Sequence, residues 1–244
     1  MPFTFSHPIA AIPFARFGLP LSALIIGSMT PDFPYFLHGS TSAQYGHSLI
    51  GTLLFCVPAG LFALWLWHRV LDVPLRSLLP TCVQRKLPRA ANIFRFWPTK
   101  QLLLIIIALL IGALTHIVWD SFTHANGFMV RNWAGLREPI FTHSHGTVYV
   151  FKVLQHGSSL LGAIALWWFC QRALRNDATN TELKSDSRLI LPMTLFAAIC
   201  AMAWTFAKTV DGASHQTRDF VLSFIVIFLI ELTAWSVLWH WKQR

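Results

Sequence analysis

A series of long apolar segments most constrains what this chain can fold into. Five segments contain the roughly 20 mostly apolar residues that an α-helix needs to cross a bilayer: His47–His68, Leu102–Thr123, Val148–Gln171, Leu189–Lys208 and Phe220–Trp241. Only 12% of the 244 residues are charged, whereas a typical soluble domain has about 25%. The sequence therefore predicts an all-α, polytopic membrane helical bundle whose apolar surface faces lipid.

The start of the chain is also apolar, but it is interrupted. Pro8–Phe17 and Leu21–Met29 are each too short to cross the membrane, and Gly18 and Pro20 separate them. We expect a re-entrant helical hairpin over Pro8–Met29, with a single kinked span as the alternative. A re-entrant backbone is tolerated at membrane depth where it is buried in protein or lines a polar cavity.

The whole chain, 1–244, is expected to form one membrane domain with four parts. These are the hairpin and outer loop (1–46), the helices of a metal site (47–171), a cytoplasmic loop (172–188) and two C-terminal spans (189–244). Lys and Arg concentrate in the connectors 69–100 and 172–188 and at the C-terminus. Because such loops stay on the cytoplasmic side, we expect a multi-pass protein of the inner membrane with its C-terminus inside. This distribution accounts for the net charge of +9, so nucleic acid is not an expected partner.

Ionisable side chains collect near the opposite, outer ends of the predicted spans. The strongest local pattern is His116-x-x-x-Asp120-x-x-x-His124, because residues four apart lie on one face of an α-helix. Imidazole and carboxylate are usual ligands of zinc and other divalent metals. An aspartate in an apolar helix is costly unless it is paired or coordinated, and a divalent cation would offset that cost.

Three further residues join this group: Asp32 and His47 fall on the same outer side, and so does His7 if the N-terminal segment is re-entrant. Together with the helical group they predict a metal site. His156, in the third span, is a weaker candidate. It precedes Gly157-Ser158-Ser159, and small residues favour close packing of helices, so a ligand role and a packing role both remain open for His156.

Several segments up to about residue 170 have a distinctive order of residues: Met1–Pro8, Leu21–Phe33, His47–Leu49, Gly112–His124 and Gln155–Ser159. Together they resemble the bacterial integral membrane family catalogued as domain of unknown function 4184. That family has no established activity, so this resemblance implies a bacterial membrane protein without assigning a reaction.

The order of the candidate ligands carries a more distant resemblance. His7, Asp32, His47, His116, Asp120 and His124 follow the ligand order of the zinc-dependent phospholipase C and single-strand nuclease superfamily, and resemble membrane-bound metal-dependent hydrolases. That superfamily closes its last metal site with His-x-x-x-Glu on a later helix. Here Lys152-x-x-x-His156 stands at the corresponding place without a glutamate, so one or two metal ions are expected.

The distant resemblance implies roles and a substrate class. One ion would be held by three ligands, His47, His116 and Asp32. Asp120 would bridge to a second ion held by His7 and could orient the attacking water, while His124 would complete a site or act on the leaving group. Asp32, Asp120 and His124 are therefore the candidate catalytic residues, and zinc is the expected metal.

This resemblance leads us to expect hydrolysis of a phosphoester or lipid-type substrate at the outer face, with membrane lipids as partners. Two alternatives remain: a metal or solute transporter, and a non-catalytic membrane protein with a structural metal site.

Overall fold

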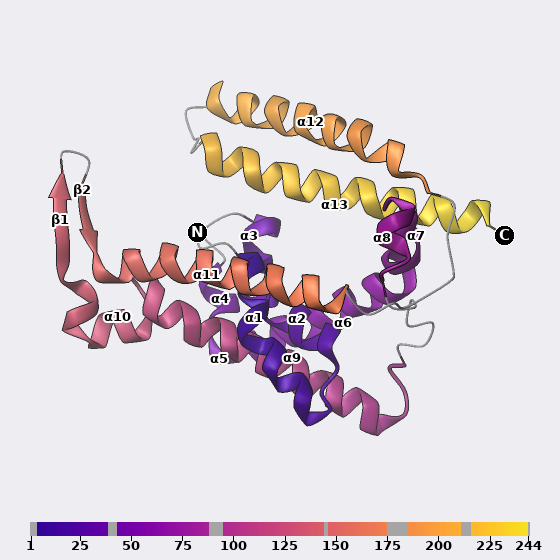
Figure 1. The fold of residues 1–244 in the computed structure, drawn as a ribbon. Helices are drawn as coiled ribbons and strands as arrows, with labels where there is room; N and C mark the ends of the chain where they lie inside the picture. Colours follow the sequence, from indigo (N-terminus) through magenta and orange to yellow (C-terminus); the bar gives the residue numbers. More distant parts are fainter. Residues whose placement is uncertain are drawn as a thin grey trace. The chain divides into compact units, whose positions relative to one another are not determined.

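The protein is built mainly of helices (Figure 1). The computed structural model describes residues 4–38, 43–87, 95–143, 146–174, 185–210 and 216–243. Within these ranges, five helical segments are long and apolar enough to cross a membrane: Leu49–Ser77, Thr99–Asn132, Val150–Ala173, Ser187–Ala207 and Asp219–Lys242. The predicted polytopic helical architecture is confirmed.

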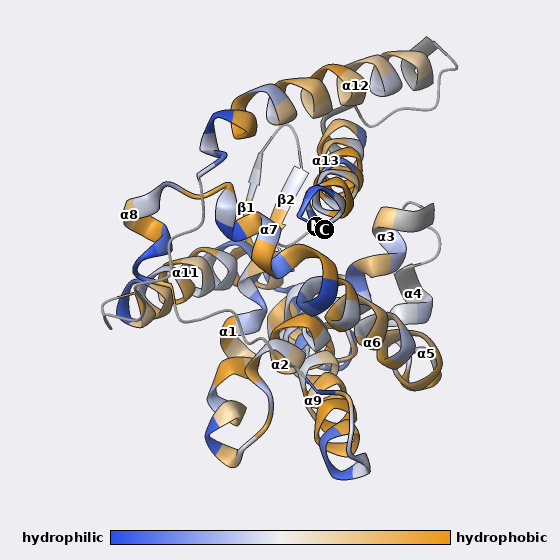
Figure 2. Ribbon diagram, turned by 90° about the vertical axis from the view of Figure 1, so that its right-hand side faces the viewer, coloured by the Kyte–Doolittle hydropathy of each residue, from blue (hydrophilic) through white to orange (hydrophobic). Residues whose placement is uncertain are grey.

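Large apolar side chains on these helices are exposed rather than buried. Examples are Leu54, Trp167, Leu191, Phe206 and Trp241, and Figure 2 shows hydrophobic residues along the long helices. In water such a surface would drive association, whereas in a bilayer it faces acyl chains. The contacts within the chain divide it into two compact units. Unit 1 comprises Met1–Pro34, His38–Leu64 and Arg95–Arg172, and unit 2 comprises Tyr35–Leu37, Trp65–Phe94 and Ala173–Arg244.

The first apolar span is longer than the sequence predicted. It runs through α5 (Leu49–Gly51), a π-helical turn (Thr52–Cys56), α6 (Val57–Leu66), a second π-helical turn (Trp67–Leu71) and α7 (Asp72–Ser77). The prediction ended it at His68. The extension is stabilised where Arg76 Nε donates to Asp72 Oδ1 at 2.8 Å, one turn apart, so these two charged groups are paired.

The N-terminal segment forms a helical hairpin, in which α1 (Pro8–Ala11) and a 3₁₀ helix (Ile12–Phe17) contact α2 (Leu21–Gly27). Gly18 makes the turn with φ 79°, a left-handed conformation that glycine adopts without strain. Two helical arms in contact describe a hairpin, not one kinked helix. Its flanks are the 3₁₀ turns Thr4–Ser6 and Thr30–Asp32, followed by α3 (Phe33–His38) and α4 (Ala43–Gly46).

The hairpin packs on α9 (Thr99–Thr123) through two glycines. A Cβ at Gly27 would lie 2.5 Å from the backbone oxygen of Leu109, and one at Gly112 would lie 2.5 Å from that of Leu24. The backbones of α2 and α9 are therefore in direct contact, as small residues permit in membrane helices. This contact brings the residues that follow α2 close to the C-terminal half of α9.

After α9 the chain forms α10 (Phe128–Asn132), a 3₁₀ turn (Ala134–Arg137) and an antiparallel pair of strands, β1 (Pro139–His143) and β2 (Gly146–Tyr149). The sequence prediction placed an outer loop here and started the third span at Val148. The strands contain β-prone residues, among them Ile140, Phe141 and Val148, and His143 pairs with Gly146 at the end of the ladder. α11 (Val150–Ala173) then follows directly.

Unit 2 contains α12 (Ile190–Val210), preceded by a 3₁₀ turn (Ser187–Leu189), and α13 (Gln216–Lys242), which lie side by side (Figure 1). It also contains α7 and α8 (Thr81–Gln84). His240 Nε2 donates to the backbone oxygen of Val70 at 3.1 Å, which links α13 to the second π-helical turn of the first span. Most of the predicted cytoplasmic loop, 175–184, lies outside the described residues.

Replacing Gly112 by alanine should separate α2 from α9, because its Cβ would collide with backbone rather than with a flexible side chain. We expect Gly112→Ala to lower the free energy of unfolding by about 1–3 kcal/mol, measured by thermal or denaturant unfolding in detergent. Gly157→Ala, the same substitution where a Cβ meets nothing within 4 Å, is the matched control and should not destabilise. Equal stability of the two variants would contradict the close contact.

Candidate metal centre

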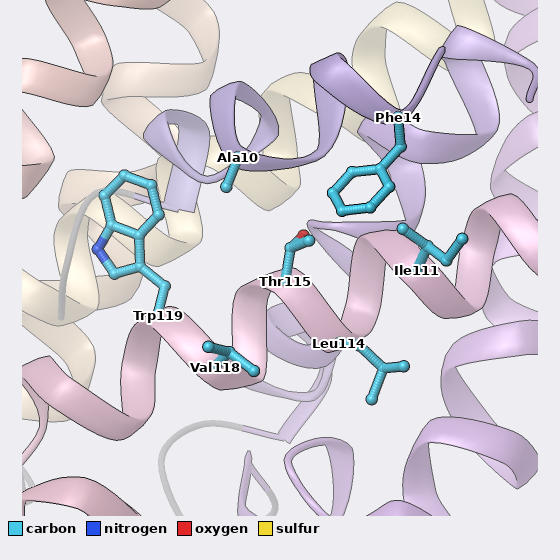
Figure 3. Close-up of a pocket in the computed structure, with 7 residues that line it drawn as sticks. All are labelled: Ala10, Phe14, Ile111, Leu114, Thr115, Val118 and Trp119. Carbon is cyan, nitrogen blue, oxygen red and sulfur yellow. The ribbon is translucent and has the colours of Figure 1, made fainter. Parts of the chain in front are cut away.

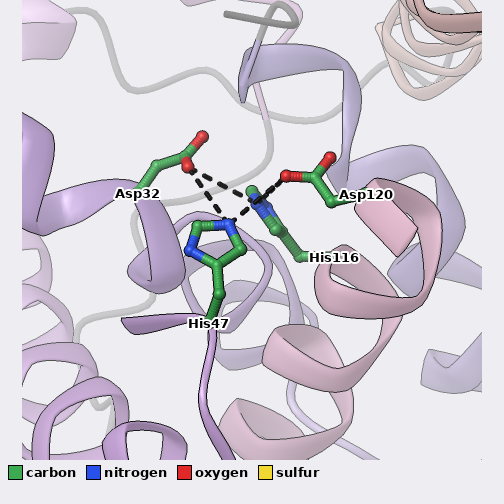
Figure 4. Close-up of side chains that lie close together, drawn as sticks. All are labelled: Asp32, His47, His116 and Asp120. Carbon is green, nitrogen blue, oxygen red and sulfur yellow. Dashed lines mark hydrogen bonds and ion pairs between the residues drawn. The ribbon is translucent and has the colours of Figure 1, made fainter. Parts of the chain in front are cut away.

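Two aspartate and two histidine side chains from three parts of unit 1 converge on one point (Figure 4). Asp32 ends the 3₁₀ turn that follows the N-terminal hairpin. His47 immediately precedes Ser48, whose side chain caps the first span by accepting from the Gly51 N–H at 2.9 Å. His116 and Asp120 lie one turn apart on α9, so the helix itself places both on one face.

The side-chain atoms of this cluster approach one another closely. His47 Nε2 lies 3.3 Å from Asp120 Oδ2 and 3.6 Å from Asp32 Oδ1. His116 Nε2 lies 3.2 Å from Asp120 Oδ2 and 3.5 Å from Asp32 Oδ1. All four atoms fall within 4.8 Å of one another, and in Figure 4 the two carboxylates flank the two imidazoles.

The four imidazole–carboxylate distances are close to the edge length of a zinc coordination tetrahedron. With metal–ligand bonds of about 2.1 Å, the ligand atoms of a tetrahedral site lie about 3.4 Å apart. The four imidazole–carboxylate distances span 3.2–3.6 Å. His116 Nε2 is buried and makes no hydrogen bond despite these neighbours, which indicates that it points toward a shared centre. The cluster can therefore hold a metal ion.

Two contacts from outside the cluster orient its members. His116 Nδ1 lies 2.7 Å from the backbone oxygen of Ser28. A carbonyl oxygen can only accept, so Nδ1 carries the proton and Nε2 faces the carboxylates. Thr4 Oγ1 donates to Asp32 Oδ2 at 2.5 Å, which leaves Oδ1 directed at the two histidines. Such partners hold ligands in position before a metal binds.

His7 lies against the edge of the cluster. Its ring stacks on that of His116, with centroids 4.0 Å apart, and its Nε2 lies 3.6 Å from Asp120 Oδ1. Among the residues that the structure describes, neither ring nitrogen of His7 has a hydrogen-bond partner, and Asp120 Oδ1 also has none. Burial, reinforced by the nearby His116, lowers the pKa of His7 to about 4, so His7 is neutral at pH 7 and able to coordinate a metal.

The two carboxylates of the cluster carry its main energetic cost. Asp32 and Asp120 are both buried, and their facing oxygens lie within 4.8 Å. Burial alone would raise the pKa of Asp32, but interactions with His116 and Thr4 outweigh it and hold that pKa below its usual value. Asp32 is therefore ionised at pH 7, and positive charge must balance it.

His124 does not continue the helical stripe that the spacing predicted. α9 ends at Thr123, and His124 is its C-cap with extended backbone (φ −114°, ψ 141°). Its Nδ1 still lies 3.4 Å from Asp120 Oδ1 because the ring folds back over the last turn. Its Nε2 lies 3.4 Å from the side-chain nitrogen of Gln155.

The structure places Gln155, not His156, beside the cluster. His156 is exposed on α11, whereas Gln155 is buried and hydrogen bonded to Lys152 at 2.8 Å. We therefore leave His156 out of the proposed ligand set. The sequence analysis did not predict Gln155 as a site residue. Its spacing from Lys152, three residues along a helix, is the one sequence feature that indicated their contact.

An open apolar cavity of about 460 Å³ lies between the N-terminal hairpin and α9 (Figure 3). Its lining residues come from both elements: Ala10, Phe14, Ile111, Leu114, Thr115, Val118 and Trp119. Trp119 connects the cavity to the cluster, because its ring lies 5.2 Å from that of His7. Its Nε1 donates to Ser158 on α11 at 3.0 Å, which fixes the indole between the two.

Comparison with known proteins identifies the family. No curated protein and no solved structure matches the chain. The model of one protein family, described as "Domain of unknown function (DUF4184)", matches residues 1–238. That match covers nearly the whole chain, including every residue of the cluster, and agrees with the resemblance seen in the sequence. This multi-pass membrane protein, with a buried histidine–aspartate cluster that could bind a metal ion, therefore belongs to the DUF4184 family.

Proposed function

We propose that this protein is a metal-dependent hydrolase of the inner membrane that cleaves a phosphoester in a lipid-type substrate at the outer face. The observation that carries the proposal is the convergence of His47, His116, Asp32 and Asp120, with four imidazole–carboxylate distances of 3.2–3.6 Å. The basic connectors 69–100 and 172–188 support a cytoplasmic position for the other ends of the spans.

A bound divalent ion would supply a nucleophilic water at neutral pH and polarise a phosphoryl oxygen. The chain's own residues set where this can happen. Asp120 directs Oδ2 to the two imidazoles of the cluster and Oδ1 toward His7, 3.6 Å away. A carboxylate in that orientation can bridge two ions, and His7 with Asp120 Oδ1 leaves positions for water and substrate at the second.

Among the described residues of the site, His47 and His124 are the histidines most accessible to water and substrate. The side chains of His47 and His124 are 23% and 31% exposed, whereas those of His7 and His116 are almost fully buried. A headgroup arriving from the aqueous boundary would therefore meet His47 and His124 first. Arg131 and Arg137, both exposed and in the same unit, offer positive charge for a phosphate.

The apolar cavity supports a substrate with a hydrocarbon chain. It lies between the hairpin and α9, a helix long and apolar enough to cross a membrane. Trp119 separates the cavity from His7, so a lipid could place its chain on one side of the indole and its headgroup on the other. Cavities of this size hold small ligands or parts of larger ones.

One observation favours a second candidate, a structural metal site. Four protein ligands complete a tetrahedron, and closed sites of that kind are usually structural, whereas catalytic sites keep a position open. A transport site has less support, because no second group of this kind occurs among the residues that the structure describes. Zinc content and hydrolysis, measured separately, distinguish the two metal proposals.

Protein purified in detergent without chelator should contain at least one zinc ion per chain. His116→Ala and Asp120→Ala should each reduce zinc to below about a tenth of that content, because each removes a ligand and leaves buried charge unbalanced. Inductively coupled plasma mass spectrometry gives the metal content. His156→Ala, an exposed histidine outside the cluster, should retain it. Wild-type protein that stays free of metal after zinc loading would contradict every metal-based function.

Lipid phosphoesters in mixed micelles should be hydrolysed by the zinc-loaded protein. Chelation should abolish turnover, added zinc should restore it, and Asp120→Asn should lower kcat by about 10²-fold or more. Stoichiometric zinc without hydrolysis of lipid or soluble phosphodiesters would instead assign the metal a structural role. Zinc flux into proteoliposomes would assign transport.

Filling the apolar cavity should discriminate between substrates by chain length. We expect Leu114→Trp to raise KM for a long-chain lipid about fivefold while leaving a short-chain soluble analogue unaffected. The effect is modest because an acyl chain that moves from the bilayer into the cavity gains only packing contacts, about 1 kcal/mol. It gains no hydrophobic transfer energy, since both environments are apolar. Leu103→Trp is the control, because Leu103 is also exposed on α9 but does not line the cavity. Equal changes for both substrates would argue against a chain-binding role.

A further inference from the structure

The two ring nitrogens of His124 face groups of opposite kind, and this determines which nitrogen carries the proton. On one side, Lys152 Nζ donates to Gln155 Oε1 at 2.8 Å. An ammonium can only donate, so the oxygen of the Gln155 amide must face Lys152 and its NH₂ group must face His124. That NH₂ group lies 3.4 Å from His124 Nε2. His124 Nε2 is therefore the acceptor.

On the other side, His124 Nδ1 faces three oxygens. The backbone oxygen of Asp120 and Thr123 Oγ1 each lie 3.3 Å away, and Asp120 Oδ1 lies 3.4 Å away. A carbonyl and a carboxylate oxygen can only accept. The Thr123 hydroxyl already donates to the backbone oxygen of Trp119 at 3.3 Å, so its oxygen also accepts here. His124 Nδ1 therefore carries the hydrogen.

We infer that Lys152, acting through Gln155, fixes His124 as the Nδ1-protonated tautomer. This ring donates to the backbone oxygen of Asp120 and positions the carboxylate, 3.4 Å away, by electrostatic attraction instead of binding metal itself. The role at the metal centre rests on the proposed function, whereas the assignment of the proton does not. It replaces the role of metal ligand that the ligand order implied for His124.

The geometry of both helices maintains this chain of contacts. Lys152 and Gln155 are three residues apart on α11, so they face the same way, and Gln155 is buried. Because α9 ends at Thr123, the extended backbone of His124 lets its ring fold back over Asp120. If the Gln155 amide were reversed, its NH₂ group would face the ammonium of Lys152, and two donors would oppose each other. The contacts thus select one tautomer.

The first test is a spectroscopic measurement on metal-free protein with ¹⁵N-labelled histidine. The His124 signals are identified by their loss in His124→Asn. We expect the shift pattern of an Nδ1–H, Nε2-unprotonated ring. Gln155→Glu presents only acceptor oxygens to Nε2 and should shift the ring to a form protonated at Nε2. A wild-type ring protonated at Nε2, or a Gln155→Glu spectrum identical to wild type, would overturn the inference.

The second test compares two replacements of His124 by competition with a zinc chelator. His124→Ala removes the donor and should weaken zinc binding by about 10–100-fold, as loss of a ligand's hydrogen-bonding partner does. His124→Asn keeps an N–H close to the Nδ1 position and should restore most of that affinity. If His124 is a ligand, both variants lose zinc alike. His156→Ala is the matched control and should bind as wild type does.

The two tests fail in different ways. If wild-type protein binds no zinc, the proposed function fails, yet the nitrogen signature still reports which tautomer His124 adopts. If zinc binds and His124→Asn behaves like His124→Ala, the positioning role fails while the metal centre stands.

Discussion

The charge of two buried carboxylates is the constraint on which the rest of unit 1 depends. Asp32 and Asp120 direct oxygens to one point from separate parts of the chain, inside a protein whose surroundings are largely apolar. Unbalanced, such a pair would cost several kcal/mol of desolvation and repulsion. Two imidazoles at 3.2–3.6 Å, directed at the same point, are the arrangement that a divalent cation would complete.

The glycine contact between α2 and α9 holds this arrangement in place. Gly27 and Gly112 let the two backbones meet. The residue after α2, Ser28, is thereby close enough for its backbone oxygen to accept a hydrogen bond from His116 Nδ1. The same contact carries the chain on to Asp32 at the level of Asp120. The same contact therefore packs the hairpin against α9 and orients the ligands, although both arms of the hairpin are short.

The sequence was sufficient for the spans, the hairpin and the members of the cluster, because long apolar runs and ionisable residues at span ends are local signals. It could not give the end of α9 at Thr123, which turns His124 from a helical stripe residue into a cap. Nor could it show that Gln155, rather than His156, faces the cluster. Adjacent residues on a helix point about 100° apart, and the sequence does not give the rotation of α11. The strands at 139–149 were missed because the pattern there is short and adjoins a long apolar helix.

The cluster is asymmetric in a way that bears on whether its metal would act or merely stabilise. Its ligands near the hairpin are enclosed, because His7 and His116 are almost fully buried. Thr4 is hydrogen bonded to Asp32 Oδ2, and the backbone oxygen of Ser28 to His116 Nδ1. On the other side His47 and His124 are partly exposed. A purely structural site gains nothing from such an opening, since partial solvent access weakens electrostatic attraction. Solvent access at His47 and His124, together with an open apolar cavity lined by Trp119, therefore accords better with the proposed hydrolase than with a purely structural metal.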